Sequence, residues 1–281
     1  MTQQDQFYNE ILEALDNGNL VLPTLPEVAL RVRDVVDEPD VTAKQLAEII
    51  TTDAALSTRL IKVANSALYR GRISSESVQM AVSRLGLNMV RNLVISLVME
   101  QMFQATSNRL GKRLHLLWEH STEVAARSQM LAQKHPRIRP DEAMLAGLIH
   151  NIGMLPILMK AEDTPELLQD TRLLDDVIMR LHNKVGAAIL DSWDFSEPLV
   201  AVPREYSNLD WDSENGPDLI DIVQVAHIQS IENTDNAIDP AKLKHSKAFK
   251  KLGLDTGMSV NELDEDSEEY AEALALFGFD A

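Results

Sequence analysis

The spacing of apolar residues along the chain is the feature that most constrains its fold. In the segment that follows Thr24, the residues Val28, Val32 and Val36 fall at i, i+4 and i+8, which places them on one face of an α-helix. Thr24 and Glu27 have the spacing of a capping box, in which each side chain satisfies a free backbone N–H of the first turn. We therefore expect a helix that begins near Thr24.

The same signals recur along the chain. Thr42 and Gln45 repeat the capping-box spacing, and Gly86 separates two further helical runs. Asp53 opens another run, whose apolar face carries Leu56, Leu60, Val63 and Ala64. No stretch shows sustained strand alternation between turn signals. The sequence therefore predicts an all-α protein of many helices.

Composition excludes several classes of protein. The chain has 281 residues, of which 45% are hydrophobic, so it can bury a sizeable core. It has no cysteine, which excludes disulfides, thiolate metal sites and a cysteine nucleophile. A net charge of -18 opposes binding to a phosphate backbone, and no uninterrupted apolar run approaches the roughly 18 to 20 residues of a membrane span. We expect a soluble protein that binds neither nucleic acid nor a membrane directly.

Charge is unevenly distributed near the C-terminus. From Asp255 onward there are nine acids and no Lys or Arg, and a basic patch precedes them: Lys242, Lys244, Lys247, Lys250 and Lys251. A solvated helix followed by a solvated tail is the simpler interpretation. The alternative is a docking segment, because the apolar sequence ALALFGF, residues 273–279, ends the acidic run.

Four histidines lie within apolar helical runs of the second half, whereas His115, His135 and His245 look peripheral; the four are His120, His150, His182 and His227. A buried imidazole needs a polar partner. Imidazoles from several helices suit Zn, Fe, Ni and Cu. What this set lacks is acid, since a hydrolytic centre usually combines His with Asp or Glu.

Three N-terminal motifs, LPTLPEVALRV, DAALSTRLIKVANSALY and AVSRLGLNMVRNLV, resemble in order and spacing the signature of the HDOD domain family, a signalling relative of the HD-type metal phosphohydrolases. The resemblance covers roughly Leu20 to Ile231. It implies a multi-helix HDOD fold in which an N-terminal helical part, residues 1–108, packs on a degenerate HD-like core, residues 109–235. A basic helix and an acidic tail, residues 236–281, would follow.

The resemblance also suggests what the histidines were once part of. His120 matches the first histidine of an HD site and His150 the histidine of the His-Asp pair, while Asn151 stands where that pair has its metal-bridging aspartate. His227 takes the place of the final aspartate, and Glu205 and Tyr206 lie near where related enzymes with two metals carry a His-His pair. The implied degenerate site comprises His120, His150, Asn151, His182, Glu205 and His227. Asparagine binds a metal only through a neutral carbonyl, so we expect no stoichiometric metal, no cofactor and no catalytic residue.

The family resemblance predicts a cytoplasmic bacterial signalling or regulatory protein that acts through contacts with signalling proteins. A groove between the N-terminal helices and the HD-like half is the candidate partner surface, with the polar residues Asp53, Asn65, Ser66, Tyr69 and Arg70. The structural alternative is that these groups cap and cross-link helices, as most buried polar groups do.

Two other functions stay open from the sequence. One is a metal-dependent phosphohydrolase, in which a divalent transition metal is held by His120, His150 and His182, with His227 or Glu205 as a further ligand. The other is a nucleotide or small-ligand sensor that keeps the pocket without the chemistry. Such a sensor in an acidic protein would need nearby cations, for which the sequence offers Arg127, Lys184 and Arg204.

Overall fold

The computed structural model describes residues 3–66, 68–103, 108–164, 167–168, 171–234, 236–243, 246–254 and 268–277, and within them every regular element is a helix. The predicted all-α fold is confirmed. The elements are α1 (Gln3–Asp16), α2 (Glu27–Val36), α3 (Ala43–Ile50), α4 (Ala54–Asn65), α5 (Val78–Leu85), α6 (Leu87–Met99), the 3-10 helix η1 (Glu100–Phe103), α7 (Asn108–Gln133), α8 (Pro140–Ile149), α9 (Met154–Ala161), α11 (Thr171–Ser192), α12 (Glu197–Glu205), α13 (Leu219–Ile231), α14 (Pro240–Leu243), α15 (Lys247–Lys251) and α16 (Glu268–Ala275).

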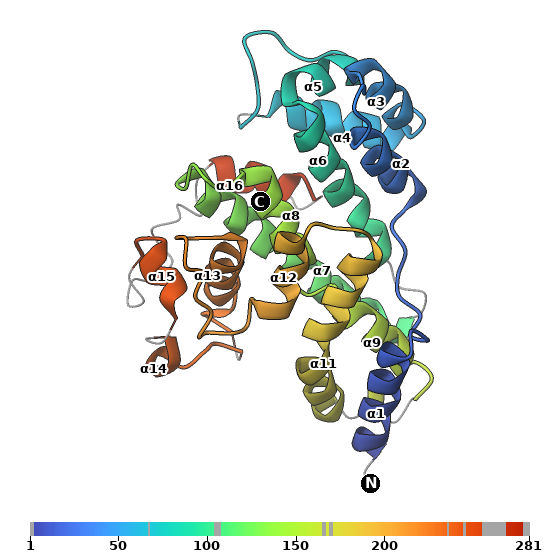
Figure 1. Ribbon diagram of the computed structural model, residues 1–281, viewed down its shortest axis with the longest axis vertical. Coiled ribbons are helices and arrows are strands. Elements are labelled where there is room, and N and C mark those ends of the chain that lie inside the picture. The colour runs from blue at the N-terminus through green and yellow to red at the C-terminus, as the bar shows by residue number, and fades with distance from the viewer. Residues whose placement is uncertain are drawn as a thin grey trace.

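Helices α2 to α5 gather at one end of the molecule, and α6 leads from them into the rest (Figure 1). The capping box predicted at Thr42 and Gln45 is present at the start of α3, and Asp53 caps α4 by accepting from the backbone N–H of Leu56 at 2.9 Å. Gly86, with φ +83°, ends α5 and begins α6. A positive φ favours glycine, so this junction depends on the residue type.

The helix start predicted at Thr24 is wrong. Helix α2 begins at Glu27 with Pro26 as its N-cap residue, and no side chain caps it. Proline fixes φ near the helical value but offers no side-chain acceptor and no backbone N–H, so the capping box cannot form there.

Helices α7 and α8 form the centre of the second half. A Cβ added to Gly147 would lie 2.8 Å from both Ala125 Cα and Val124 O, so the two helices touch backbone to backbone. The turn before Pro140 and the acid after it predict from sequence that Asp141 caps a new helix. This prediction is wrong, because Pro140 is already the first residue of α8 and no side chain caps the helix. Asp141 lies one residue inside the helix, and its carboxylate is buried. There it accepts from Asn92 Nδ2 at 2.7 Å and from Arg139 at 2.5 Å, so it is not available to cap the helix.

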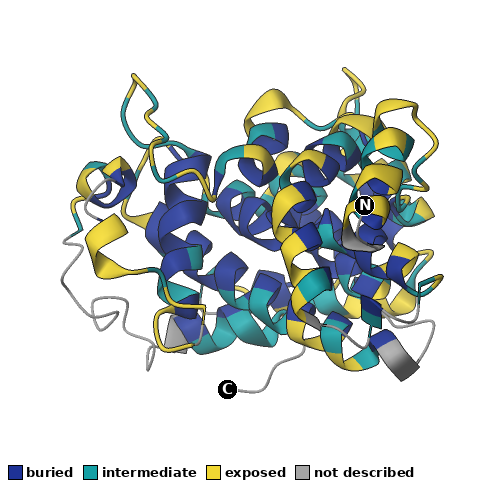
Figure 2. Ribbon diagram, turned by 90° about the horizontal axis from the view of Figure 1, so that it is seen from below, coloured by how far each residue is buried: buried dark blue, intermediate teal, exposed yellow. Residues whose placement is uncertain are grey.

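The segment Pro140–Ala161, which spans α8 and α9, is long and apolar enough to cross a membrane by composition, and 83% of its most apolar window is buried inside the molecule. The apolar residues of this segment therefore form part of the core of this fold. Figure 2 shows how the buried faces of the helices meet in the interior while their other faces are exposed.

Two glycines fix how α11 approaches the turn between α8 and α9. A Cβ added to Gly153 would lie 2.0 Å from the carbonyl oxygen of His182 and 2.4 Å from the backbone nitrogen of Gly186. Real Cβ atoms do not approach backbone this closely. The contact therefore requires glycine, and it places His182 beside the turn that carries His150.

The first helix packs on the second half rather than on its neighbours in sequence. The Arg180 guanidinium of α11 lies 3.9 Å from the centre of the Tyr8 ring of α1, and Trp193 Nε1 donates to the carbonyl of Pro23 at 2.9 Å. One hydrophobic cluster extends from Phe7 to Phe277. The three-part division at residues 108 and 235 stays a prediction.

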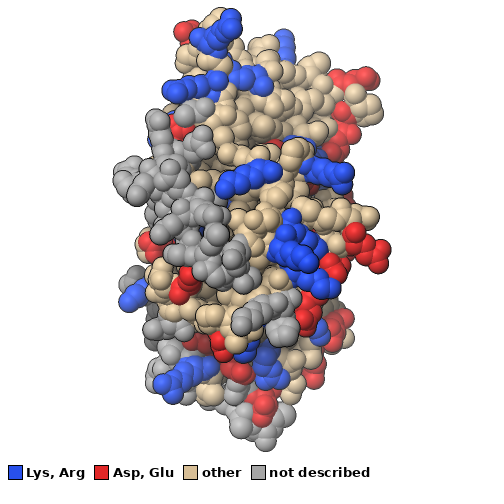
Figure 3. Space-filling model, turned by 90° about the vertical axis from the view of Figure 1, so that its left-hand side faces the viewer, with Lys and Arg blue, Asp and Glu red and all other residues tan. Residues whose placement is uncertain are grey.

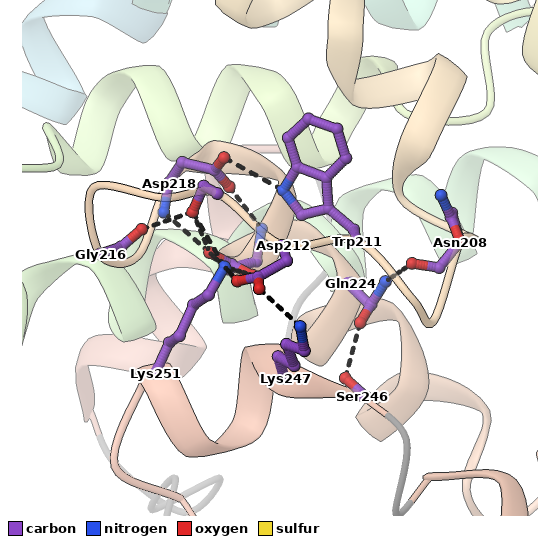
Figure 4. Close-up of polar contacts among 11 residues, drawn as sticks. Asn208, Trp211, Asp212, Gly216, Asp218, Gln224, Ser246, Lys247 and Lys251 are labelled. Atoms are coloured by element: carbon purple, nitrogen blue, oxygen red, sulfur yellow. Dashed lines mark hydrogen bonds and ion pairs between the residues drawn. The ribbon is translucent and has the colours of Figure 1, made fainter.

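The basic segment before the tail is partly a packing element. Lys247 pairs with Asp212 at 2.6 Å, and Lys251 pairs with buried Asp221 at 3.2 Å (Figure 4). Gln224 Oε1 accepts from the Ser246 hydroxyl at 2.7 Å. These contacts hold α15 against α13, so the predicted solvated helix is wrong for its inner face. Lys244 and residues 255–267 of the acidic tail lie outside the described residues.

The C-terminal helix α16 packs on α7 of the same chain. The Phe277 ring lies edge-on to Trp118 with centroids 5.8 Å apart, and Arg127 lies 5.7 Å from the centre of the Tyr270 ring. Phe277 is buried. The apolar end of the tail therefore does dock, as the alternative interpretation proposed, but within its own molecule.

Candidate functional site

Three histidines from separate helices meet in the second half of the molecule. His120 comes from α7, His150 follows the last residue of α8, and His227 comes from α13. One ring nitrogen of each lies within 4.8 Å of those of the others, and the ring centroids are 5.1 to 5.5 Å apart. We call these three residues the histidine cluster.

Hydrogen bonds orient all three rings. His150 Nδ1 donates to the carbonyl of Gly147 at 2.6 Å, which leaves its Nε2 as an acceptor. That Nε2 is buried and has no hydrogen-bond partner among the described residues. His120 Nε2 lies 3.1 Å from His227 Nδ1, so one of these two nitrogens donates a hydrogen bond to the other. The cluster therefore presents at least one free imidazole lone pair to its own interior.

The histidine cluster is neutral near pH 7. Burial lowers the pKa of His120 to about 4, and burial together with the neighbouring imidazoles His120 and His182 lowers the pKa of His227 to about 3. Burial, followed by the nearby His120 and His227, also holds the pKa of His150 well below its usual value. Neutral imidazole is the form that binds metals.

His182 lies outside the cluster and reaches it through Tyr206. Its Nδ1 donates to the carbonyl of Ile178 at 2.8 Å, and its Nε2 accepts from the Tyr206 hydroxyl at 2.8 Å. The Tyr206 ring packs edge-on against His150, with centroids 4.8 Å apart, and against His227 at 5.1 Å. Burial raises the pKa of Tyr206, which keeps the phenol protonated as the donor.

The two other predicted site residues differ in position. Asn151 is fully buried beside the cluster, where its Oδ1 accepts from the Ser121 hydroxyl at 2.9 Å. Glu205 accepts from Asn208 Nδ2 at 2.9 Å and does not join the cluster. The neighbouring Tyr206 faces the imidazoles instead. The resemblance points to both Glu205 and Tyr206, and only Tyr206, the residue that follows α12, reaches the cluster.

The cations proposed for a small-ligand site are engaged elsewhere or exposed. Arg127 pairs with Glu123 at 2.8 Å, and Arg204 pairs with Glu197 at 3.0 Å. Lys184 is exposed. No contact within the described part of the chain brings any of the three to the histidine cluster, so the structure adds no support for the sensor.

The residues of the candidate partner surface make structural contacts in most cases. Asp53 caps α4, and Ser66 ends the same helix. Asn65 binds both backbone groups of Ser75, accepting from N at 2.7 Å and donating to O at 2.9 Å. Tyr69 is partly buried, and Arg70 is exposed.

Comparison with known proteins identifies the family of the chain. Residues 22–209 match the model of the HDOD domain. The chain belongs to the HDOD domain family. A solved structure from Shewanella amazonensis, provisionally described as a metal-dependent phosphohydrolase, is 34% identical with a TM-score of 0.82, and the match covers 99% of this chain and 98% of that one.

Two other relatives are more distant. An HDOD domain protein of unknown function from Geobacter sulfurreducens is 21% identical over 98% of both chains, with a TM-score of 0.70, and shares the fold. An uncharacterised protein of Treponema pallidum is 27% identical over 241 residues, which are 81% of this chain and 45% of that protein. The chain thus spans less than half the length of that relative.

The donor set of the cluster limits its chemistry. Within the described residues, no Asp or Glu joins the three imidazoles. A pair of hydrolytic metal ions does not fit, since carboxylates normally bridge such ions and offset their charge. A single borderline ion such as Zn or Ni does fit, because imidazole is its preferred neutral ligand and His150 Nε2 is free to bind it.

Proposed function

We propose that this HDOD protein is a non-catalytic regulatory module that acts through contacts with other proteins. The observation that carries the proposal is the composition of the histidine cluster, in which three neutral imidazoles and the amide of Asn151 stand where hydrolysis would need carboxylates. Signalling proteins as its partners and the cytoplasm as its location are expectations that rest on the family resemblance.

A turnover screen tests this proposal. Purified protein is incubated with phosphomonoesters and phosphodiesters while Mn, Fe, Ni or Zn is added singly, and released phosphate or alcohol is measured. We expect no rate above that of the metal alone. Turnover that disappears in His150→Ala and persists in His115→Ala would overturn the proposal, because His115 is an exposed histidine on the same helix as His120.

A second candidate is a phosphohydrolase with one metal ion, and one observation favours it. The buried, unpartnered Nε2 of His150 would cost about 1 to 3 kcal/mol if nothing bound it. His120, His150 and His227 would hold the ion, whereas His182 would remain bonded to Tyr206. The ion would supply a Lewis acid.

Thermal melting with and without Ni or Zn separates the two candidates. The one-ion phosphohydrolase predicts that the metal raises the melting temperature of the wild type and not of His227→Ala, and that the same metal supports turnover. A rise in melting temperature without turnover would reject the enzyme and leave the regulatory proposal in place.

A further inference from the structure

Two basic segments lie next to each other in a protein whose net charge is -18. One is the loop between α4 and α5, and the other is the turn between α7 and α8; both project toward the left in Figure 1. Their five cations, which we call the basic surface, are Arg70, Arg72, Lys134, Arg137 and Arg139.

Tyr69 joins the two segments. Its hydroxyl accepts from Gln129 Nε2 at 2.6 Å, near the end of α7. Burial, and then the negative charge of the nearby Asp141 at the start of α8, raise the pKa of Tyr69. Asp141 in turn binds Arg139 at 2.5 Å. Arg70, the residue after Tyr69, is therefore brought to the side of the molecule that carries the α7–α8 turn.

Backbone contacts fix the shape of the α4–α5 loop although it has no regular structure. Asn65 binds the backbone of Ser75 at 2.7 and 2.9 Å. Arg84 donates to the carbonyl of Ala64 at 2.8 Å and to that of Ile73. A loop held at several points presents its exposed side chains in one arrangement, which lowers the entropy lost when a partner binds.

Most of the basic surface has no acidic partner in the described structure. Arg70, Arg72, Lys134 and Arg137 are exposed, and none of them forms an ion pair with a described residue. Ile73, which follows Arg72 in the same loop, is 74% exposed. Figure 3 shows Lys and Arg side chains across the upper and middle parts of the face toward which the two segments project.

We infer that the basic surface binds a short acidic segment of a partner protein, an inference that rests on the proposed action through protein contacts. A nucleic acid fits less well, because a strand extending past the surface would meet a strongly acidic molecule. A short acidic segment carries its charge only where it meets the cations. Ile73 offers a contact for an apolar residue within that segment.

Fluorescence anisotropy with a short labelled peptide of Glu and Leu tests the inference. The variant Arg70→Glu with Arg137→Glu reverses two charges of the basic surface. The control Arg31→Glu with Lys112→Glu makes the same change in net charge at two exposed cations elsewhere, which also lack a described ion-pair partner. All four side chains are exposed, so we expect both variants to melt like the wild type.

We expect the peptide to bind the wild type, and its affinity to fall at least about tenfold in Arg70→Glu with Arg137→Glu, which is about 1.4 kcal/mol. In the control it should fall less than about twofold. Arg70→Ala with Arg137→Ala, which removes charge without reversing it, should show an intermediate loss and replaces the first variant if that one does not fold.

Three results would overturn the inference: no binding to the wild type, equal losses in both charge-reversal variants, or tighter binding of single-stranded DNA or anionic vesicles that is lost in Arg70→Glu with Arg137→Glu. Turnover of phosphoesters is measured independently of peptide binding. A failure of the proposed function and a failure of the basic surface can therefore be recognised separately.

Discussion

At the scale of single residues, the histidine cluster makes stability depend on pH. The pKa of His120 is about 4 and that of His227 about 3, whereas an unfolded histidine titrates near 6.5. The unfolded chain therefore binds more protons as pH falls below 6.5, so acid favours unfolding. We predict that the melting temperature of metal-free protein falls by several degrees between pH 7 and pH 5.

Variants identify the source of this pH dependence. His227→Gln should reduce the fall, because it removes one of the groups whose pKa is lowered. His115→Gln, at an exposed position, should leave the fall unchanged. Equal pH dependence in the wild type and His227→Gln would show that the cluster does not titrate as its burial predicts.

Asn151 offers a second test at the same scale. In metal-free protein, Asn151→Asp should lower the melting temperature at pH 7.5, because it places a carboxylate at a fully buried position. Zn or Ni should then raise that temperature by more than it does in the wild type, since the variant regains an anionic ligand. Calorimetric titration that shows no gain in metal affinity would mean that the surrounding geometry no longer suits an ion.

The sequence groups four histidines as one candidate site, and the structure brings three of them together while His182 lies outside the cluster. Helical spacing is enough to direct His120 inward, and His150 and His227 lie in apolar runs. It could not predict that Tyr206 lies between His182 and the cluster. That arrangement depends on how closely α11 and α12 approach the rest, which is set by contacts between distant segments.

At the scale of elements, the glycine contact between α11 and the turn before α9 should be intolerant of substitution. Gly153→Ala would place a Cβ 2.0 Å from the carbonyl oxygen of His182. We predict a loss of stability of about 3 kcal/mol or more, at the upper end of overpacking effects. Denaturant unfolding measures it. Gly71→Ala is the control, because its Cβ would meet only the Arg84 side chain at 3.4 Å, and similar losses in the two variants would contradict the prediction.

The α4–α5 loop gives a second prediction for an element. Asn65→Ala leaves the backbone groups of Ser75 without their side-chain partner and removes an acceptor of Arg84. We expect a lower melting temperature and a loss of about 1 to 3 kcal/mol. Unchanged melting would mean that Asn65 has no structural role, and unchanged peptide binding as well would mean that it does not hold the α4–α5 loop in the arrangement that binds the peptide.

Helix starts show where local sequence is sufficient and where it is not. The box at Thr42 and the cap at Asp53 form because nothing nearby competes with them. After Thr24, Pro26 occupies the N-cap position. The Asp141 carboxylate accepts hydrogen bonds from buried Asn92 and from Arg139 instead of capping the helix. A cap is thus predictable from sequence only when proline and tertiary partners leave it free.

At the scale of the whole molecule, periodicity predicted the all-α class, but it could not predict which helices pack together. The placement of α1 on α11 and of α16 on α7 follows from contacts between opposite ends of the chain. Tyr8 and Phe277 are ordinary apolar positions in sequence, and nothing local names their partners. The family resemblance, which spans most of the chain, supplied the architecture that local patterns could not.

The most direct test of the central claim is the metal content of the purified protein, determined by elemental analysis, with phosphoester turnover measured on the same samples. The regulatory account predicts well under one transition-metal ion per chain and no turnover. About one ion per chain, with turnover, and the loss of both in His150→Ala would contradict it.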